Sequence, residues 1–133
     1  MSEPAPASSS LDLHVRAATL EALFVQAAQD MYSLVGASAK PDVILRRTLE
    51  VRGEDHASLL LAWLRELLAF TSLEDRVFYD FTVIMLSPLR LRAQLIGGLK
   101  ERVERRLTIE LGLEIVIRHT ADGFEATIPF KPA

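Results

Sequence analysis

The 133-residue sequence predicts a single α+β domain in which two helices pack on one mostly antiparallel sheet. Three observations favour this class. Two stretches in the first half carry apolar residues at helical spacing, and the second half is rich in strand patterns. With 50% hydrophobic and 25% charged residues, the chain also has the composition of an ordinary globular domain. The expected order of elements is β-α-β-α-β-β-β-β.

Residues 1–10 are rich in serine, proline and alanine, which predicts a disordered tail before a single domain over residues 11–133. This segment has neither the basic region nor the apolar core of a secretion signal. The longest apolar run, residues 59–64, is far shorter than the roughly 20 residues that cross a bilayer. We therefore expect a cytoplasmic protein without a membrane segment.

The first helix is expected between a short strand and a glycine. Residues 11–16 alternate apolar and polar side chains, as in a strand with one buried face. Thr19 fits a helix N-cap, because its hydroxyl can accept a hydrogen bond from the first helical turn. Residues 20–34 place apolar side chains at helical spacing. Gly36 fits the end of this helix, since glycine readily adopts the left-handed backbone found there.

The second helix follows a strand predicted over residues 43–52. Asp55 fits the helix N-cap, and a wide apolar face predicts a helix at the centre of the core. This face comprises Leu59, Leu60, Trp63, Leu64, Leu67 and Leu68. Residues 77–85 are rich in strand-forming side chains and predict the third strand. We expect one side of that strand to carry Tyr79, Phe81, Val83 and Met85.

The rest of the chain is expected to be mostly β. Apolar and polar residues alternate over residues 89–95, as in a half-solvated antiparallel strand that a glycine pair at 97–98 ends. Residues 100–106 then predict a charged connection of one or two helical turns. A long strand is expected over residues 107–118, with an interruption at Gly112. Asp122 and Gly123 indicate a hairpin turn before the last strand, whose apolar positions are Phe124, Ala126, Ile128 and Phe130.

Composition and motifs do not indicate an enzyme. The sequence has no cysteine, which excludes disulfides, thiolate metal sites and a thiol nucleophile. It contains no phosphate-binding loop, dinucleotide fingerprint or serine-hydrolase elbow. Its histidines, His14, His56 and His119, are scattered and lack companions at metal-binding spacing. The net charge of −3 creates no strong overall field for nucleic acid or an anionic membrane.

Residues 53–81 combine an acidic turn, a leucine-rich helix with the motif WLRELL, a short loop and an aromatic-rich strand. Upstream, residues 19–31 begin TLEALF and continue with an alanine pair and a methionine. In this order and spacing, residues 11–130 resemble the archease family, small accessory proteins of the tRNA-splicing RNA ligase. The resemblance implies an archease-like fold. It also implies a non-catalytic factor that docks on an RNA ligase and promotes its activation or turnover in tRNA splicing or RNA repair.

The opening motif departs from the family pattern. Archeases begin with an Asp-His-Thr-Ala-Asp run before the first strand, whereas residues 8–12 read SSSLD. Only Asp12 matches, at the position of the second acid. Similar letters recur in residues 119–122, but there the Asp-Gly pair that begins at Asp122 is a turn pattern. We interpret that second occurrence as coincidence.

Two later stretches also depart from the family, which carries a lysine-containing run ending in Thr-Tyr-His-Asp. Here Arg105 and Arg106 supply the basic residues, and Glu110 stands where the histidine is expected. Near the family's closing metal-site acid, this chain has Lys131. The resemblance implies a site for calcium, manganese or magnesium, but with Asp12 as the one matching acid that site looks incomplete. We therefore name no cofactor.

The remaining candidates have simpler interpretations beside the functional ones. Lys131 and Asp12 are either a pair that replaces a metal or, as we favour, two unrelated solvated charges. Glu110 is either a general acid or base or, as we favour, a solvated strand glutamate. Together Glu110, Arg105, Arg106 and Lys131 form a candidate functional surface.

Two other functions stay open. The missing motif residues favour a diverged, non-catalytic interaction module without a metal site or a ligase role. A weaker alternative is a small RNA-binding protein, whose phosphate contacts would come from the basic residues of the β half. These are Arg46, Arg47, Arg90, Arg92, Lys100, Arg102, Arg105 and Arg106.

Overall fold

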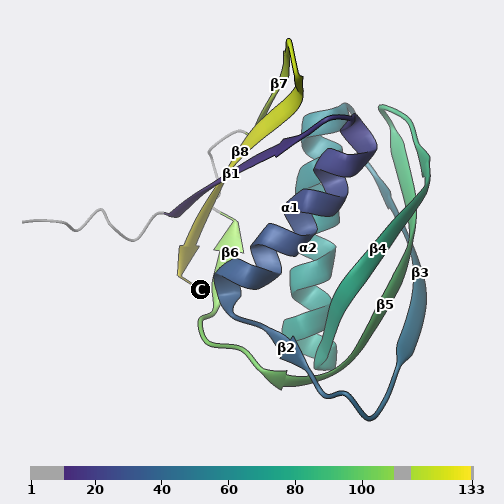
Figure 1. The fold of residues 1–133 in the computed structure, drawn as a ribbon, viewed down its shortest axis with the longest axis vertical. Coiled ribbons are helices and arrows are strands. Elements are labelled where there is room, and N and C mark those ends of the chain that lie inside the picture. Colours follow the sequence, from purple (N-terminus) through teal and green to yellow (C-terminus); the bar gives the residue numbers. More distant parts are fainter. Residues whose placement is uncertain (1–10, 110–114, 133) are drawn as a thin grey trace, which may run out of the picture.

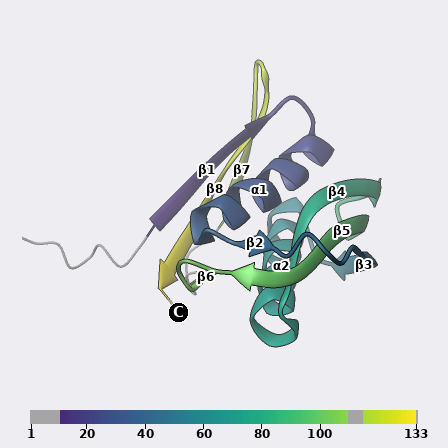
Figure 2. The ribbon, with the colours of Figure 1, turned by 60° about the horizontal axis from the view of Figure 1, so that its bottom comes forward.

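The computed structural model describes residues 11–109 and 115–132, and it confirms the α+β class. Within these residues lie two helices, α1 (Leu20–Val35) and α2 (His56–Glu74), and eight strands, in the order β-α-β-β-α-β-β-β-β-β. The strands form two antiparallel sheets instead of the predicted single sheet. The helix pair lies between the two sheets (Figures 1 and 2).

One sheet is centred on the last strand, β8 (Gly123–Pro132). Along one edge β8 pairs with β1 (Leu11–Ala17), over the full length of β1. Along its other edge β8 pairs with β6 (Leu107–Ile109) and β7 (Val116–Thr120). The strand predicted over residues 107–118 is thus represented by two short strands. Gly112, the predicted interruption, lies outside the described residues.

The other sheet is centred on β5 (Arg90–Arg102), which lies between β3 (Leu45–Arg52) and β4 (Arg76–Leu86). A short strand that was not predicted, β2 (Ser38–Ala39), pairs with the far end of β5. The prediction that the glycine pair ends this strand is wrong, because β5 continues to Arg102 and leaves no helical turn at residues 100–102. Gly97 permits a close crossing: a Cβ there would lie 2.1 Å from the Val77 carbonyl oxygen.

The face of β4 differs from the expectation at Tyr79 and at Met85, since a second register shift pairs Met85 with the exposed Arg92 whereas Val83 pairs with the buried Ala93. A register shift between Phe78 and Asp80 places an extra residue in β4 relative to β5. Phe78 and Phe81 are therefore both buried, whereas Tyr79 is 53% exposed. The prediction that Tyr79 shares the buried side with Phe81 is wrong, because the bulge interrupts the two-residue alternation.

The three predicted helix caps are confirmed. The Thr19 side chain accepts a hydrogen bond from the Ala22 amide at 3.1 Å, and Gly36 ends α1 with a φ of 64°. Asp55 begins α2 in a reciprocal arrangement with Ser58, in which each side chain accepts from the backbone of the other. No helix in the described part of the chain combines the length and apolar character needed to cross a bilayer.

The buried side chains of α2 explain why two sheets are needed. They extend around much of the helix: Leu59, Leu60, Trp63, Leu64, Leu67, Phe70 and Thr71. A helix that is apolar over so wide an arc must be covered from more than one side. Trp63 ties the layers together, since its indole nitrogen donates to the Phe24 carbonyl at 2.9 Å and its ring meets Phe81 edge-on at 6.0 Å.

Candidate functional site

Asp12 and Lys131 lie on neighbouring strands of the β8-centred sheet. In the register of β1 and β8, Asp12 is opposite Pro129, and Lys131 follows two residues later. Because side chains alternate along a strand, Asp12 and Lys131 project from the same face as diagonal neighbours. The ion pairs found among the described residues do not include these two. The pairing hypothesis therefore has proximity in its favour but no contact.

Asp12 does not gather further metal ligands in the described structure. A hard divalent cation needs several oxygen ligands, usually including carboxylates. Within residues 11–109 and 115–132, no three histidine or acidic side chains come together in a way that could hold a metal ion. Glu110 lies outside these residues. The described side chains thus do not fit the metal site that the resemblance implies.

The residues that repeat the family's opening letters lie at the opposite end of β8 from Asp12. Residues 121 and 122 form the turn between β7 and β8, and the Thr120 hydroxyl donates to the Gly123 carbonyl at 3.3 Å. His119 stacks on Phe124 with ring centroids 4.5 Å apart. The hairpin prediction is confirmed. This stretch cannot substitute for the opening motif, because it turns the chain far from Asp12.

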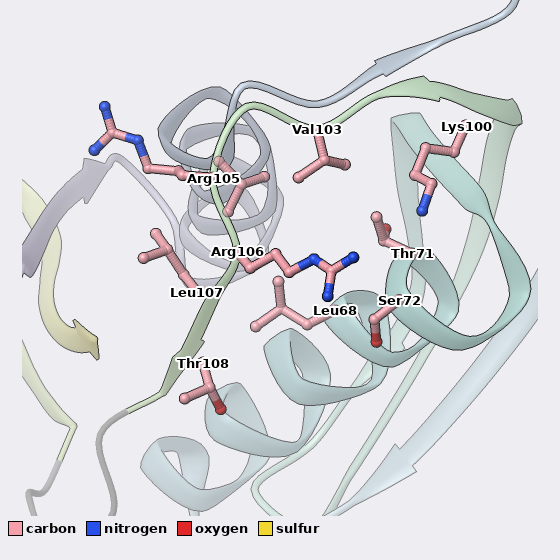
Figure 3. A pocket seen from close by; sticks show the side chains of 10 residues that line it. Leu68, Thr71, Ser72, Lys100, Val103, Arg105, Arg106, Leu107 and Thr108 are labelled. Carbon is pink, nitrogen blue, oxygen red and sulfur yellow. The ribbon is translucent and has the colours of Figure 1, made fainter. Parts of the chain in front are cut away.

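Arg105 and Arg106 lie on the connection between β5 and β6 and point in different directions. The amide of Arg105 donates to the Val35 carbonyl at 3.1 Å, which holds this connection against the end of α1. The Arg106 side chain extends toward Thr71 and Ser72 of α2, whereas that of Arg105 points away from them (Figure 3). The charged groups of these adjacent arginines therefore point in different directions, although both residues line one cleft. Nothing in the sequence pattern distinguishes them.

The basic residues proposed as an RNA patch are largely paired with acids. Around the Glu50 carboxylate, at 3.6 to 4.0 Å, lie Arg52, Arg90 and Arg92. Arg47 contacts Glu74 at 3.0 Å, and its guanidinium lies 4.3 Å from the centre of the Phe70 ring. Arg47 therefore links β3 to α2, whereas Arg52, Arg90 and Arg92 surround one carboxylate on β3 and β5.

Comparison with known proteins places most of this fold in one family. The sequence of residues 8–110 matches the archease protein family. The matched range contains both helices, the β5-centred sheet and Asp12, Arg105 and Arg106, whereas Lys131 lies beyond it. No curated protein matches the chain.

Proposed function

Because the chain belongs to the archease family, whose members are non-catalytic accessory proteins, we propose that it promotes the activation or turnover of an RNA ligase. The reaction served would be RNA joining in tRNA splicing or RNA repair. The observation that carries this proposal is the family match over residues 8–110.

The preserved core supports the proposal at the level of the fold. Trp63 and Leu64, at the start of the WLRELL motif, are fully buried, and Trp63 joins α2 to α1 by its hydrogen bond to Phe24. Arg65 and Glu66 of the same motif are exposed. The motif thus combines core residues that maintain the fold with charged residues that are open to a partner. A core alone does not assign a function.

The partner-facing surface that we propose lies where β1, β8 and the connection to β6 meet. It contains Asp12, Lys131 and Arg105, with Thr108 opposite Lys131 in the strand register. Asp12 and Arg105 are exposed, and Lys131 is half-buried. Charged groups at the rim of an interface steer association and set register more than they add affinity. These residues would orient the chain on its ligase and take no part in the chemistry.

A diverged interaction module without a ligase role is the competing function. It is favoured because no three acidic or histidine side chains come together among the described residues, so the acidic site that the resemblance implies is not assembled there. In that case the chain would keep the archease fold and bind a different protein.

Ligase turnover separates these two functions. The RNA ligase of the same organism would be assayed at limiting concentration, with nucleotide and divalent metal, in the presence and absence of this chain. The accessory role predicts multiple turnovers only when the chain is added. Single turnover in both cases, with the chain shown to be folded by circular dichroism, would refute the accessory role and leave the interaction module.

Charge removal tests the proposed surface. Arg105→Gln with Lys131→Gln should lower ligase stimulation several-fold, because both charges lie on the surface that we assign to the partner. Arg118→Gln is the matched control, since Arg118 is exposed on β7 of the same sheet. An equal effect of both changes would mean that overall charge, and not this surface, matters.

A further inference from the structure

A cleft of about 350 Å³ lies between the C-terminal end of α2 and the segment that leads from β5 to β6. Its volume is within the range of small-molecule sites. Apolar side chains contribute to both sides of the cleft, Leu68 from α2 and Val103 from the connection after β5 (Figure 3). Lys100 enters the cleft from β5 and Arg106 from the connection that follows it, and their cationic groups both point toward the last turns of α2. The cleft thus combines basic groups with apolar side chains.

The lining of the cleft is basic and contains no carboxylate. Its charged members are Lys100, Arg105 and Arg106, and its hydroxyl-bearing members are Thr71, Ser72 and Thr108. The Thr71 hydroxyl is already committed to the Arg76 carbonyl at 2.8 Å. Ser72 and Thr108 are thus the hydroxyl groups best placed to serve a ligand.

The negative charge at the C-terminal end of α2 does not neutralise all the positive charge in the cleft. The helix has no basic residue in its last turn and ends with two acids, Glu74 and Asp75. Glu74 is contacted by Arg47 and Arg76, and Asp75 by Lys100 at 2.8 Å. Beyond these pairs, the helix terminus adds only about half a negative charge. Arg106 pairs with no carboxylate among the described residues, so a cation remains.

We propose that this cleft binds a phosphate group between Arg106 and Lys100. The planar guanidinium of Arg106 can donate two parallel hydrogen bonds to phosphate oxygens, and the Lys100 ammonium has two N–H donors left beside its 2.8 Å contact with Asp75. Ser72 and Thr108 add hydroxyl groups to the lining. The phosphate would belong to a small phosphorylated compound or to the end of an RNA strand, with the attached group against Leu68 and Val103. This assignment is independent of the ligase role.

Calorimetric titration of the folded chain with pyrophosphate and with inorganic phosphate tests the site directly. Saturable binding of pyrophosphate is expected, and Arg106→Gln should weaken it about tenfold or more, the loss expected for a charge-assisted contact. Arg102→Gln is the matched control, because Arg102 is an exposed arginine at the end of β5, four residues before Arg106, and does not line the cleft. That control should change binding by no more than about twofold. Absence of saturable binding, or equal weakening by both substitutions, would overturn the proposal.

Two further arms identify the source of the phosphate. A 5′-phosphorylated RNA octamer that displaces pyrophosphate, when its unphosphorylated twin does not, would support an RNA end as the ligand. Displacement by a nucleoside diphosphate alone would support a small compound. Lys100→Gln should weaken the binding of either ligand. Unfolding curves of this variant should show that loss of the Asp75 contact leaves the fold intact. Binding of RNA that is insensitive to Arg106→Gln would overturn the assignment of this cleft.

Discussion

The two ends of α2 are completed in opposite ways. At the N-terminal end, Ser58 donates its amide to Asp55 at 2.8 Å and its hydroxyl accepts from the Asp55 amide at 3.1 Å. The backbone bond from Ser58 also lowers the pKa of the Asp55 carboxyl. At the C-terminal end, the compensating cations come from distant strands, Arg47 from β3 and Lys100 from β5. The N-terminal end of α2 is thus stabilised by residues of its own first turn, whereas the C-terminal end is stabilised by residues from distant strands.

The C-terminal end of α2 is also where the helix joins the β5-centred sheet. Asp75 ends the helix in a left-handed conformation, with a φ of 56°. A hydrogen bond from Lys100 holds the pKa of the Asp75 carboxyl below its usual value, and the Lys100 amide donates to the Asp75 carbonyl at 2.7 Å. Helix exit and strand pairing therefore depend on each other. Changes at the C-terminal end should cost more than changes at the N-terminal cap.

Gly97→Ala should have the largest effect. The new Cβ would lie 2.1 Å from the Val77 carbonyl oxygen, two residues after the end of α2 at Asp75. Backbone atoms must move, so we expect the free energy of unfolding in urea to fall by about 3 kcal/mol. Gly98→Ala is the graded comparison, because a Cβ there would meet the Lys40 and Val43 carbonyl oxygens at 2.9 Å and should therefore cost less than Gly97→Ala. Equal losses for the two changes would show that the crossing beside the helix exit is not the cause.

Tyr32→Phe should have the next largest effect. The Tyr32 hydroxyl donates to the Leu67 carbonyl at 3.1 Å and lies 3.2 Å from the Thr71 hydroxyl, both near the C-terminal end of α2. Loss of this buried group should lower the free energy of unfolding by about 1 kcal/mol at neutral pH. Tyr79→Phe, at an exposed position, should change it little.

The same pair of variants gives a pH test. Burial raises the pKa of Tyr32 from 10.0 to about 12, so the folded state holds the phenol proton more tightly than the unfolded state. This contribution is complete below pH 10 and is lost as the pH rises toward 12, by up to roughly 3 kcal/mol. Tyr32→Phe should remove most of that decline, whereas Tyr79→Phe should retain it. Identical declines in both variants would contradict the assignment.

Arg47→Met, which removes a contact at the C-terminal end of α2, should have an intermediate effect on the free energy of unfolding. The substitution removes both the 3.0 Å contact with Glu74 and the cation over Phe70. Because the pair is partly exposed, the expected loss in the free energy of unfolding is about 1 kcal/mol, and it should shrink in high salt. Arg46→Met, at the neighbouring exposed position on β3, is the control. A loss for Arg46→Met as large as for Arg47→Met would argue against the tertiary contact.

Ser58→Ala should have the smallest effect. It removes one half of the reciprocal cap, and the exposed Glu54 and Asp55 amides can turn to water instead. We expect a loss of roughly 0.5 kcal/mol by thermal unfolding. Ser33→Ala, on the exposed side of α1, should be nearly neutral. A loss for Ser58→Ala that exceeds the one for Arg47→Met would reverse the comparison between the two ends of α2.

The difference between local and long-range contacts also explains which sequence predictions are confirmed. Thr19, Gly36 and Asp55 are correctly predicted as helix ends, because a cap acts on residues within one helical turn. The glycine pair in β5 is misread as a break, because glycine also marks a place where another backbone passes closely. Tyr79 is assigned to the wrong face, because a bulge depends on the partner strand and leaves no pattern in its own.

The candidate site also depends on contacts between residues that are far apart in the sequence. Asp12 and Lys131 are interpreted from the sequence as two unrelated solvated charges, with a pair as the alternative, and the strand register places them diagonally on one face without an ion pair among the described residues. The cleft could not be anticipated, because Ser72, Lys100 and Arg106 come from separate elements. Arg105 and Arg106 are equivalent in the sequence, and only the path of the chain beyond β5 points their charged groups in different directions.

Sequence alone determined the α+β class, the two helices, most of the strands and the family resemblance. These properties depend on periodicity, local caps and residue order, which are written into short stretches of chain. Tertiary structure decided the division into two sheets, the compensation of the C-terminal end of α2 and the formation of the basic cleft. Each of these requires residues far apart in the chain to meet, and their meeting is set by the packing of α2 between two layers.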